Sequence, residues 1–404
     1  MKKVLSILLS VAMIVLCFAA CGKTDGDKSS TGKAANVKVG FIFLHDENST
    51  YDKNFITAAE EACKKAGVEI LKKTNISETQ ACYDAAAELV DEGCNVIFAD
   101  SFGHEPYVIQ AAKKFPEVQF LHATGTKAHT EGLSNYHNAF ASIYEGRYLA
   151  GVAAGMKLNE MISSGKITAD KAKMGYVGAY TYAEVISGYT SFYLGAKSVC
   201  PSVTMEVTFT GSWYDETAEK EAAQKLINNG CVLISQHADS MGAPTACEAA
   251  GVPNVSYNGS TVSACPNTFI VSSRIDWAPY LEYAIDCVKN GKAIDTDWTG
   301  TLSTGSVVLT DVNTKAAAEG TQAKIDEVKA ELESGKLHVF DTSAFTVTVS
   351  DSKNKNATVD ADGHLTGYKA DIDSDADNTG DTEVVSDGYF HESEKRSAPC
   401  FDVQ

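Results

Sequence analysis

The amino-acid sequence predicts an α/β fold with two similar lobes, each a parallel sheet flanked by helices. The first observation behind this prediction is the alternation of short apolar segments with amphipathic segments of helix length, which is typical of βαβ units. The second is an internal repeat. Residues 37–101 and residues 172–240 both begin with an apolar strand that contains a glycine, and both close on an apolar strand that runs into Asp-Ser. A chain of 404 residues has room for two or three domains, so the repeat predicts two lobes of the same build.

Two helices of the repeat carry local start signals. Ser77 and Gln80 form a capping-box pattern ahead of an amphipathic stretch with Cys82 and Leu89 on one face. Asp215 is placed to cap the matching helix of the second copy. The strands between them, such as VGFIFL and NVIFA, are apolar throughout, which predicts burial on both faces of a sheet.

Composition argues against several classes of partner. The chain is 44% hydrophobic and 22% charged, as expected for a globular protein with a sizeable core. Its formal net charge of −19 argues against nucleic acid as a partner and against a polybasic attachment to anionic lipid.

The cysteines favour packing over chemistry. Two of the eleven lie in the first 21 residues, and the others are scattered without CxxC or the Cys/His spacing of metal sites. We therefore expect buried core thiols, no metal and no cofactor. If a disulfide forms on an oxidising surface, Cys200 and Cys265 are the expected participants, because each stands beside a proline in a predicted loop.

The N-terminus predicts export and a lipid anchor. Residues 1–20 contain two lysines followed by an apolar run from Val4 to Ala20, which is the pattern of a secretory signal peptide. The run ends in FAAC, so we expect Cys21 to carry lipid and residues 21–36 to form a flexible tether. The predicted location is the extracytoplasmic face of the cell membrane. An ordinary signal peptide or an uncleaved anchor is the alternative.

Aromatic, acidic, amide and hydroxyl side chains follow the predicted strands of both lobes. Ligands of open α/β sheets bind outside the carboxyl ends of the strands, so these side chains predict a site in the cleft between the lobes. The candidates are Asp46, Tyr51, Asp100, Ser101, Phe102, Trp213, His237, Asp239 and Asn258, together with Trp277 near a return between the lobes.

A flat heteroaromatic ligand suits this set. Such a ring needs aromatic faces on both sides and a fixed pattern of donors and acceptors at its edge. We expect Trp213 and Tyr51 to form the aromatic pair. Phe102 is the next candidate for an aromatic face. The acids, His237 and Asn258 are expected to contact the edge of the ring.

Packing roles are the alternative for several of these residues. His237 could be a hydrogen-bonded core residue, and Asp239 could cap the helix that starts near Gly242. Ser240 lacks a GxSxG elbow, so QHADS does not predict a hydrolase and we expect no enzyme. Residues expected to pack rather than to bind are Phe55 in the core and Glu145, Arg147 and Tyr148 at the lobe crossover.

Several stretches resemble the basic membrane protein family. They are SFGHEPYVIQAAKKFPEVQFLHATG, YEGRYLAGVAAG, KMGYVGA, GSWYDETAEKEAAQKLINNG and SQHADS, and the resemblance covers about residues 37–340. This family comprises lipid-anchored substrate-binding proteins of ABC transporters and includes the purine nucleoside receptor A lipoproteins. The resemblance implies a two-lobed periplasmic binding protein of type I, which closes on its ligand like a hinge, and an ABC permease as partner.

The resemblance also implies where the lobes divide. Lobe 1 is expected to comprise residues 37–141 with about 271–300, and lobe 2 residues 142–270 with about 301–340. Hinge crossovers are expected near residues 141–150, 271–276 and 297–306. Residues 341–404 would then be an acidic C-terminal extension.

A purine base or nucleoside is the ligand that the resemblance implies. Where nucleoside receptors of the family carry an aspartate and a ribose-binding lysine, this chain has Asn258 and Ser273. The QHxDS form resembles binders of free purine bases, and base against nucleoside stays open. Alternatives are another solute, such as a sugar or riboflavin, or a receptor lipoprotein that signals through a membrane partner.

The extension contains an acidic segment from Asp360 to Asp381 with interleaved glycines. None of its registers fits a twelve-residue EF-hand loop fully. We therefore expect a solvated acidic loop, with weak binding of a divalent cation as the alternative.

Overall fold

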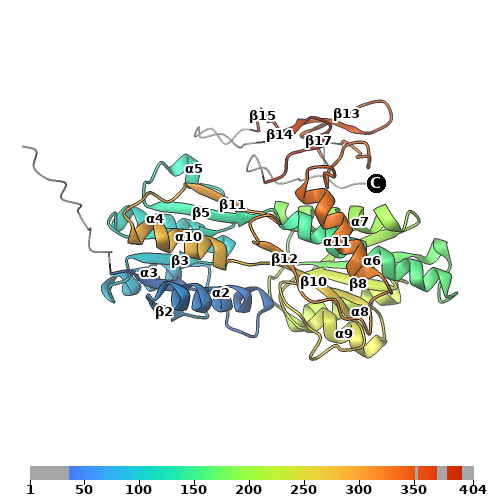
Figure 1. Ribbon diagram of the computed structural model, residues 1–404, viewed down its shortest axis with the longest axis horizontal. Coiled ribbons are helices and arrows are strands. Elements are labelled where there is room, and N and C mark those ends of the chain that lie inside the picture. Colours follow the sequence, from blue (N-terminus) through green and yellow to red (C-terminus); the bar gives the residue numbers. More distant parts are fainter. Residues whose placement is uncertain (1–35, 351–353, 371–379, 394–404) are drawn as a thin grey trace, which may run out of the picture. The chain divides into compact units, whose positions relative to one another are not determined.

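Two six-stranded sheets form the framework of the computed structural model (Figure 1). The structure describes residues 36–350, 354–370 and 380–393. In the first sheet the strand order is β11-β5-β4-β3-β1-β2, and all neighbours are parallel. Its strands are β1 (Lys38–Ile42), β2 (Glu69–Lys73), β3 (Val96–Ala99), β4 (Gln119–Ala123), β5 (Tyr136–Ala141) and β11 (Asp297–Gly300).

The second sheet repeats this order as β12-β10-β9-β8-β6-β7. Its strands are β6 (Lys173–Gly178), β7 (Thr204–Phe209), β8 (Leu233–His237), β9 (Asn254–Tyr257), β10 (Phe269–Ile275) and β12 (Val307–Leu309). Only the edge strand β12 runs antiparallel to its neighbour within this sheet. The predicted fold class, two lobes that each hold a parallel sheet flanked by helices, is confirmed.

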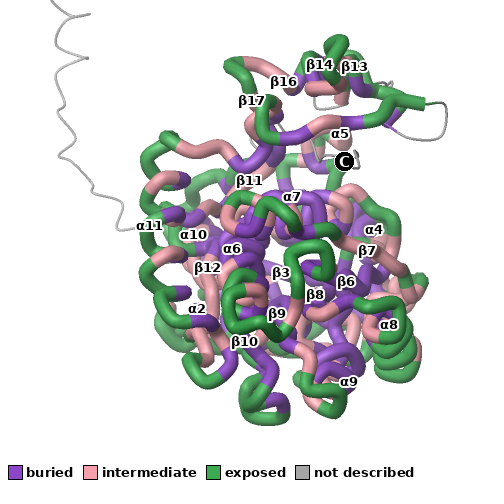
Figure 2. The backbone as a smooth tube through the Cα atoms, turned by 90° about the vertical axis from the view of Figure 1, so that its right-hand side faces the viewer, coloured by how far each residue is buried: buried purple, intermediate pink, exposed green. Residues whose placement is uncertain are grey.

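Helices cover both faces of each sheet. With the first sheet lie α2 (Thr50–Ala66), α3 (Gln80–Asp91), α4 (Glu105–Lys114), α5 (Ala128–Glu131) and α10 (Ala278–Lys289). With the second lie α6 (Ile143–Ser163), α7 (Ala183–Val199), α8 (Glu216–Asn228), α9 (Gly242–Ala250) and α11 (Thr321–Glu333). Figure 2 shows that the central strands and the inner parts of α6 and α7 are among the buried parts of the chain.

Glycines let α6 and α7 pack closely. A Cβ atom added to Gly151 would lie 2.1 Å from the carbonyl oxygen of Phe192, and one added to Gly195 would lie 2.0 Å from that of Tyr148. These neighbours are backbone atoms that cannot move aside, so only glycine fits there. The stretch YEGRYLAGVAAG therefore maintains the contact that positions α7, whose first turn reaches the cleft.

Of the two predicted helix starts, one is confirmed and the other is wrong. Asp215 Oδ1 accepts a hydrogen bond of 2.9 Å from the Ala218 amide, as expected of a cap. The capping box from Ser77 to Gln80 is wrong, because Thr79 caps α3 through the Ala81 amide. Glu78, just before this cap, instead accepts hydrogen bonds from the loop that follows β3.

The chain crosses between the sheets after β5, after β10 and between β11 and β12. One expected boundary is corrected. Residues 271–275, placed in lobe 1 from the sequence, lie in β10, which pairs with β9 in the second sheet. Ladder hydrogen bonds hold these residues to lobe 2 as far as Ile275, and lobe 1 resumes with α10, which packs on α2.

The C-terminal extension contains small sheets. Strands β13 (Ala357–Val359), β14 (Leu365–Ala370) and β15 (Thr382–Glu383) form one, and β16 (Val385–Ser386) and β17 (Tyr389–Phe390) form another. The solvated loop expected from Asp360 to Asp381 is wrong for β14, because Leu365 and Tyr368 are buried in the hydrophobic core. Residues 371–379 lie outside the described part of the chain.

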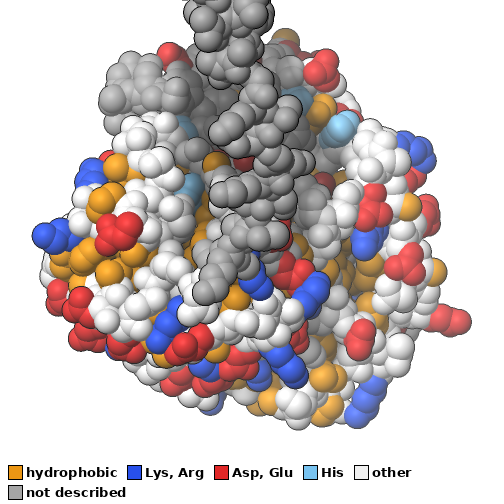
Figure 3. Space-filling model, turned by 60° about the vertical axis from the view of Figure 1, so that its left-hand side comes forward, with side chains coloured by type: hydrophobic (Ala, Val, Ile, Leu, Met, Phe, Trp, Pro, Cys, Tyr) orange, Lys and Arg blue, Asp and Glu red, His pale blue; other side chains and the backbone are white. Residues whose placement is uncertain are grey.

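The eight described cysteines, Cys200 and Cys265 among them, are all buried and free, so the pairing considered for those two is not formed. No helix within residues 36–350, 354–370 and 380–393 combines the length and apolar character needed to cross a membrane. The predicted signal peptide, Cys21 and nearly all of the tether fall outside the described residues. On the face in Figure 3, Lys and Arg side chains are interspersed with Asp and Glu.

Candidate ligand-binding site

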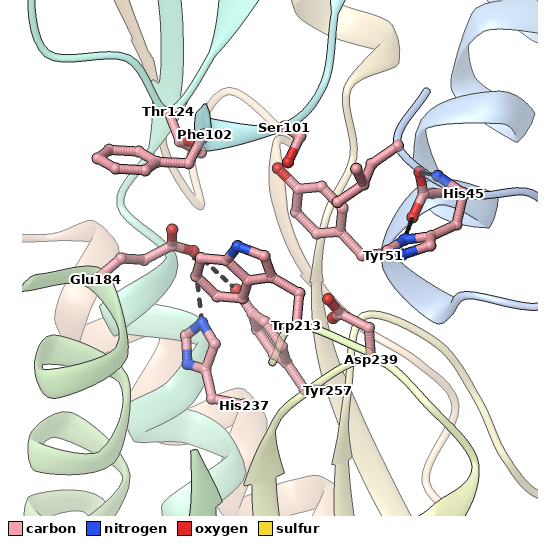
Figure 4. A pocket seen from close by; sticks show the side chains of 12 residues that line it. His45, Tyr51, Ser101, Phe102, Thr124, Glu184, Trp213, His237, Asp239 and Tyr257 are labelled. Carbon is pink, nitrogen blue, oxygen red and sulfur yellow. Dashed lines mark hydrogen bonds and ion pairs between the residues drawn. The ribbon is translucent and has the colours of Figure 1, made fainter. Parts of the chain in front are cut away.

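A cavity lies between the two lobes, where the carboxyl ends of their strands face each other (Figure 4). Lobe 1 contributes Leu44, His45, Tyr51, Asp52, Ser101, Phe102 and Thr124. Lobe 2 contributes Glu184, Trp213, His237, Asp239 and Tyr257. The cavity measures about 20 Å³, close to the space of one water molecule, so a ring-shaped ligand enters only after a side chain or a lobe moves.

The structure brings together six of the residues predicted from the sequence. These are Tyr51, Ser101, Phe102, Trp213, His237 and Asp239. Tyr51 and Trp213 come from opposite lobes, as a pair of aromatic faces requires. In Figure 4 the Trp213 indole lies in the middle of the cleft. It packs against Tyr180, with ring centroids 5.2 Å apart, and against Tyr182 at 5.9 Å.

Four predicted residues do not line the cavity. Asp46 accepts hydrogen bonds from the backbone and side chain of Asn48 in the loop after β1. Asp100 is fully buried behind the wall, where its Oδ1 accepts the Leu44 amide and its carbonyl accepts the Tyr51 hydroxyl at 2.7 Å.

Asn258 does not line the cavity but lies behind Asp239, and its Nδ2 donates to Asp239 Oδ1 at 3.2 Å. Trp277 is a correction, because it lies in the core with 1% of its surface exposed. Its indole stacks on Phe55 at 4.4 Å, so apolar burial has taken it away from the cleft. Ser273, the departure at the expected lysine position, is also buried and accepts a hydrogen bond from Arg147.

Sequence reasoning missed six of the lining residues, Glu184 and Tyr257 among them. The Tyr257 hydroxyl donates to Glu184 Oε1 at 3.3 Å, and His237 Nε2 lies 3.5 Å from the same oxygen. The rings of His237 and Tyr257 contact each other with centroids 4.2 Å apart. The available signal for Glu184 was an acid in the first turn of the helix that follows a strand end.

A buried arginine sets the hydrogen-bonding state of His237. Arg147 is completely buried and donates to the Tyr176 hydroxyl oxygen at 3.2 Å, and that oxygen lies 3.3 Å from His237 Nδ1. A guanidinium only donates, so the tyrosine hydrogen is left for Nδ1. Burial lowers the pKa of His237, which favours the neutral ring. The proton then sits on Nε2, and His237 presents an N–H donor toward Glu184 and the cavity.

Arg147 thus has a second role besides the one expected at the crossover. Its guanidinium carbon lies 5.4 Å from the ring centroid of Tyr176, 5.0 Å from that of Phe192 and 5.2 Å from that of Tyr257. These aromatic faces stabilise the cation where it is out of contact with water. The buried positive charge of Arg147 therefore lies behind the lobe 2 side of the cavity.

The cavity itself is lined by acids and neutral groups. Among the described residues that line it, none is a lysine or an arginine. Burial, reinforced by Glu219, raises the pKa of Asp239 well above its usual range. A protonated Asp239 offers one donor and one acceptor, and Glu184 adds an acceptor. Such a lining favours a neutral or cationic ligand with N–H groups over a phosphate or a carboxylate.

The lobes touch across the cleft. The Thr50 amide and hydroxyl of lobe 1 both donate to the Asp239 carbonyl of lobe 2, at 3.1 Å each. The rings of Phe102 and Tyr182 meet at 5.4 Å from opposite sides. These contacts describe a closed arrangement of the two lobes.

Comparison with known proteins identifies the family. Residues 40–337 match the family described as ABC transporter substrate-binding protein PnrA-like. The chain belongs to this family. The family resemblance seen in the sequence is thereby confirmed, and PnrA-like proteins bind a substrate for an ABC transporter.

Relatives and a solved structure agree with this assignment. A purine-binding protein of Brucella abortus is 30% identical over 310 residues, which is 75% of this chain and 83% of that protein. A Haloferax volcanii protein, provisionally named an ABC transporter glucose-binding protein, is 27% identical over 80% of this chain and 78% of its own length. The structure of an ABC transporter solute-binding protein from Conexibacter woesei matches with a TM-score of 0.62. That match covers 75% of this chain and 98% of that one at 21% identity, and shows the shared fold.

Proposed function

We propose that this PnrA-like protein captures a purine base or nucleoside between its lobes and delivers it to an ABC permease. The observation that carries the proposal is the placement of Tyr51 and Trp213 on opposite lobes beside edge groups of both hydrogen-bonding kinds. A planar heteroaromatic ring between two aromatic faces gains about 0.5–1.5 kcal/mol per pair beyond its area burial.

The edge groups suit a purine. Purine rings carry acceptor nitrogens and N–H donors around one rim. His237 Nε2–H would donate to a ring nitrogen, while Glu184 and Asp239 would accept N–H groups. A site with buried polar groups of this kind rejects analogues that leave them unpaired. The name of the Brucella relative, purine-binding protein, supports the same ligand class.

A sugar is the second candidate, because the Haloferax relative is named for glucose. Sugars also pack on aromatic rings, and Asp239 or Glu184 would accept their hydroxyls. The nitrogen donor at His237 is not decisive here, since it serves a hydroxyl oxygen as well as a ring nitrogen.

Calorimetric titration of residues 36–404, which form one unit of the chain, would test the ligand class. The titrants are adenine, hypoxanthine, guanine, their nucleosides, glucose, ribose and riboflavin. A ligand at about 100 times its Kd also raises the free energy of unfolding by about 2.7 kcal/mol, which thermal unfolding would register. Binding of glucose or riboflavin without any purine would overturn the proposal.

We also propose that Cys21 carries a diacylglyceryl anchor and that the protein works at the extracytoplasmic face of the cell membrane. The supporting observation is the FAAC stretch after an apolar run. Two acyl chains bind a membrane stably, whereas one binds only marginally. Full-length protein expressed in a bacterium should incorporate labelled palmitate and fractionate with membranes, and Cys21→Ser should abolish both. A variant that keeps the label would contradict the anchor.

Transport and signalling remain distinguishable by the partner. A substrate-binding protein delivers its ligand, so deleting the gene should stop uptake of the labelled ligand by cells. Continued uptake together with loss of a transcriptional response would favour the receptor alternative. We propose no chemical step on the ligand, and recovery of unchanged ligand after incubation would be the corresponding check.

A further inference from the structure

Two exposed aromatic rings meet at the outer rim of the cleft. Phe102 of lobe 1 is 36% exposed and Tyr182 of lobe 2 is 43% exposed, yet their ring centroids lie only 5.4 Å apart. Exposed apolar side chains that stand singly on a surface need no explanation, but a pair that meets from two lobes does. The rings lose this contact as soon as the lobes separate, so the contact belongs to the closed arrangement.

We propose that Phe102 and Tyr182 form a latch at this rim, which sets how often the two lobes separate. We call the pair the rim latch. The inference concerns the motion of the lobes, and its consequence for ligand release rests on the proposed function.

The lobe 1 half of the rim latch projects from a fixed loop. Glu78 accepts hydrogen bonds from the residues on both sides of Phe102, the Ser101 hydroxyl at 2.6 Å and the Gly103 amide at 2.8 Å. A Cβ atom added to Gly103 would lie 2.5 Å from the carboxyl carbon of Glu78, so glycine permits this close approach. The backbone of Phe102 is therefore held in place although its ring is exposed.

The lobe 2 half is held at the start of a helix. Tyr182 immediately precedes α7, and its carbonyl accepts the Ile186 amide at 3.0 Å. Its ring stacks on Tyr180 with centroids 5.0 Å apart and 21° between the planes. Because Tyr180 also packs on Trp213, the rim latch is joined to the ring site through aromatic contacts.

The rim latch lies on the side of the ring site where there is more space. Figure 4 shows Phe102 on the far side of Trp213 from Tyr51 and Asp239, and Asp239 is the residue that bonds to the other lobe. On the Phe102 side lies a second cavity of about 340 Å³, lined by Phe102, Trp213 and Tyr182 among others. A ligand that leaves through this larger space passes the rim latch.

Amide hydrogen exchange tests the rim latch without any ligand. The Thr50 amide donates to the Asp239 carbonyl of the other lobe at 3.1 Å, so its exchange reports separation of the lobes. An aromatic pair shifts such an equilibrium by about fivefold. We expect Tyr182→Ser, in residues 36–404, to speed exchange of the Thr50 amide about fivefold by NMR. The Val232 amide, which bonds to the Lys173 carbonyl inside lobe 2, should not change.

Two further variants make the test specific. Tyr182→Phe keeps the ring and should exchange like the wild type at Thr50. Phe209→Ser removes another exposed ring of lobe 2, one that lines neither cavity, and should also match the wild type. With adenine as the probe, Tyr182→Ser should release the ligand about fivefold faster, although Tyr182 does not line the first cavity.

The other outcomes separate the rim latch from the purine proposal. Unchanged exchange at Thr50 in Tyr182→Ser would overturn the latch. Faster exchange at both Thr50 and Val232 would also overturn it, because the tyrosine would then act through overall stability. A Tyr182→Phe variant that exchanges as fast as Tyr182→Ser would assign the effect to the hydroxyl and not to the ring contact. Adenine release at the wild-type rate despite faster exchange would refute the consequence for the ligand. The expected exchange pattern in a protein that binds no adenine would support the latch and count against the purine proposal.

Discussion

The Asp-Ser pairs after β3 and β8 share their letters but not their positions. Ile97 of β3 and Ile234 of β8 each lie opposite a glycine of the central strand in their sheet. Three residues further on, the first lobe has Asp100 and the second has His237. The Asp-Ser of lobe 2 therefore comes two residues later than that of lobe 1, and Asp239 stands where the first lobe has Phe102.

This shift decides which side chain faces the ligand site. In lobe 1 Ser101 lines the cavity and Asp100 is buried behind it; in lobe 2 Asp239 lines the cavity and Ser240 is fully buried. A glutamate near the start of the helix that precedes the strand supports each loop. The Ser101 hydroxyl donates to Glu78 at 2.6 Å, and the Ser240 amide donates to Glu219 at 3.2 Å. The repeat thus provides one framework, and a two-residue shift of Asp-Ser along the loop gives its two ends different chemistry.

The largest expected effect comes from removing Arg147, which supports His237 through Tyr176. Asp100, the residue at the corresponding position of lobe 1, does not have this support. Arg147→Met leaves the Tyr176 hydroxyl, the Ser235 hydroxyl and two carbonyl oxygens without their donor. We expect the free energy of unfolding to fall by about 4 kcal/mol, because each buried group that loses its partner costs about 1–3 kcal/mol. Urea unfolding at constant pH would measure the change.

A nitrogen-15 NMR spectrum of the histidine ring would separate positioning from stability. In the wild type the spectrum should show His237 protonated on Nε2 alone, and in Arg147→Met a mixture of tautomers. Arg274→Met is the control, since Arg274 is half-buried and bonds to Asn54 and Asp276. An unchanged tautomer in Arg147→Met would contradict the role assigned to this arginine.

The second effect tests the glutamate that supports the lobe 2 loop. Burial raises the pKa of Glu219 from its usual 4.5 to about 7. The folded protein then holds a proton that the unfolded chain has released, so stability falls as pH rises from about 4.5 to about 7. A shift of this size corresponds to about 3 kcal/mol.

Glu219→Gln should remove this part of the pH dependence, since glutamine does not titrate. Urea unfolding at pH 5 and pH 8 would show a smaller difference for the variant than for the wild type. Glu78→Gln, which changes the carboxylate that supports the equivalent loop of lobe 1, gives the cost of losing the side-chain hydrogen bonds at constant pH. Equal pH dependence in Glu219→Gln and the wild type would remove Glu219 as the cause.

The fold and the place of the cleft could be predicted because both follow from periodic patterns. Apolar strands that alternate with helices define parallel sheets, and the carboxyl ends of those strands mark the ligand edge. The roles of particular residues depend on strand register and packing, which the amino-acid sequence alone does not show. Asp100 and Asp239 look equivalent in the sequence, yet only the second lines the cavity.

Two other residues show the same limit. Glu184 could not be predicted because it reaches the cavity from the first turn of α7, whose approach depends on glycine contacts with α6. Trp277 was expected near the cleft because of its place at a return between the lobes. Its indole is instead buried against Phe55, because a large apolar ring gains more from the core than from a wet cleft.

The third effect tests whether one aromatic from each lobe clamps the ligand. Trp213→Ala should weaken purine binding by about 2 kcal/mol, roughly 30-fold, since a buried tryptophan at the centre of a site contributes on that order. Trp213→Phe should retain most of the affinity because it keeps a ring face. Trp277 is buried in the core and Trp298 packs on Tyr280 away from the cavity, so a change in tryptophan fluorescence on binding should shrink strongly in Trp213→Phe. Full affinity in Trp213→Ala would break the assignment of this aromatic pair.

The smallest effect concerns the contact that joins the two loops across the cleft. Thr50→Val removes the hydroxyl bond to the Asp239 carbonyl and leaves the amide bond in place. One neutral hydrogen bond contributes about 1 kcal/mol, so the variant should bind ligand about fivefold more weakly. The loss should appear in the dissociation rate, because the bond forms only when the lobes close. Thr57→Val, exposed on the same helix, is the control and should bind like the wild type. A Thr50→Val variant with an unchanged dissociation rate would show that the amide bond alone holds the lobes together. The two-residue shift of Asp-Ser in lobe 2 would then matter for the side chain of Asp239 and not for closure.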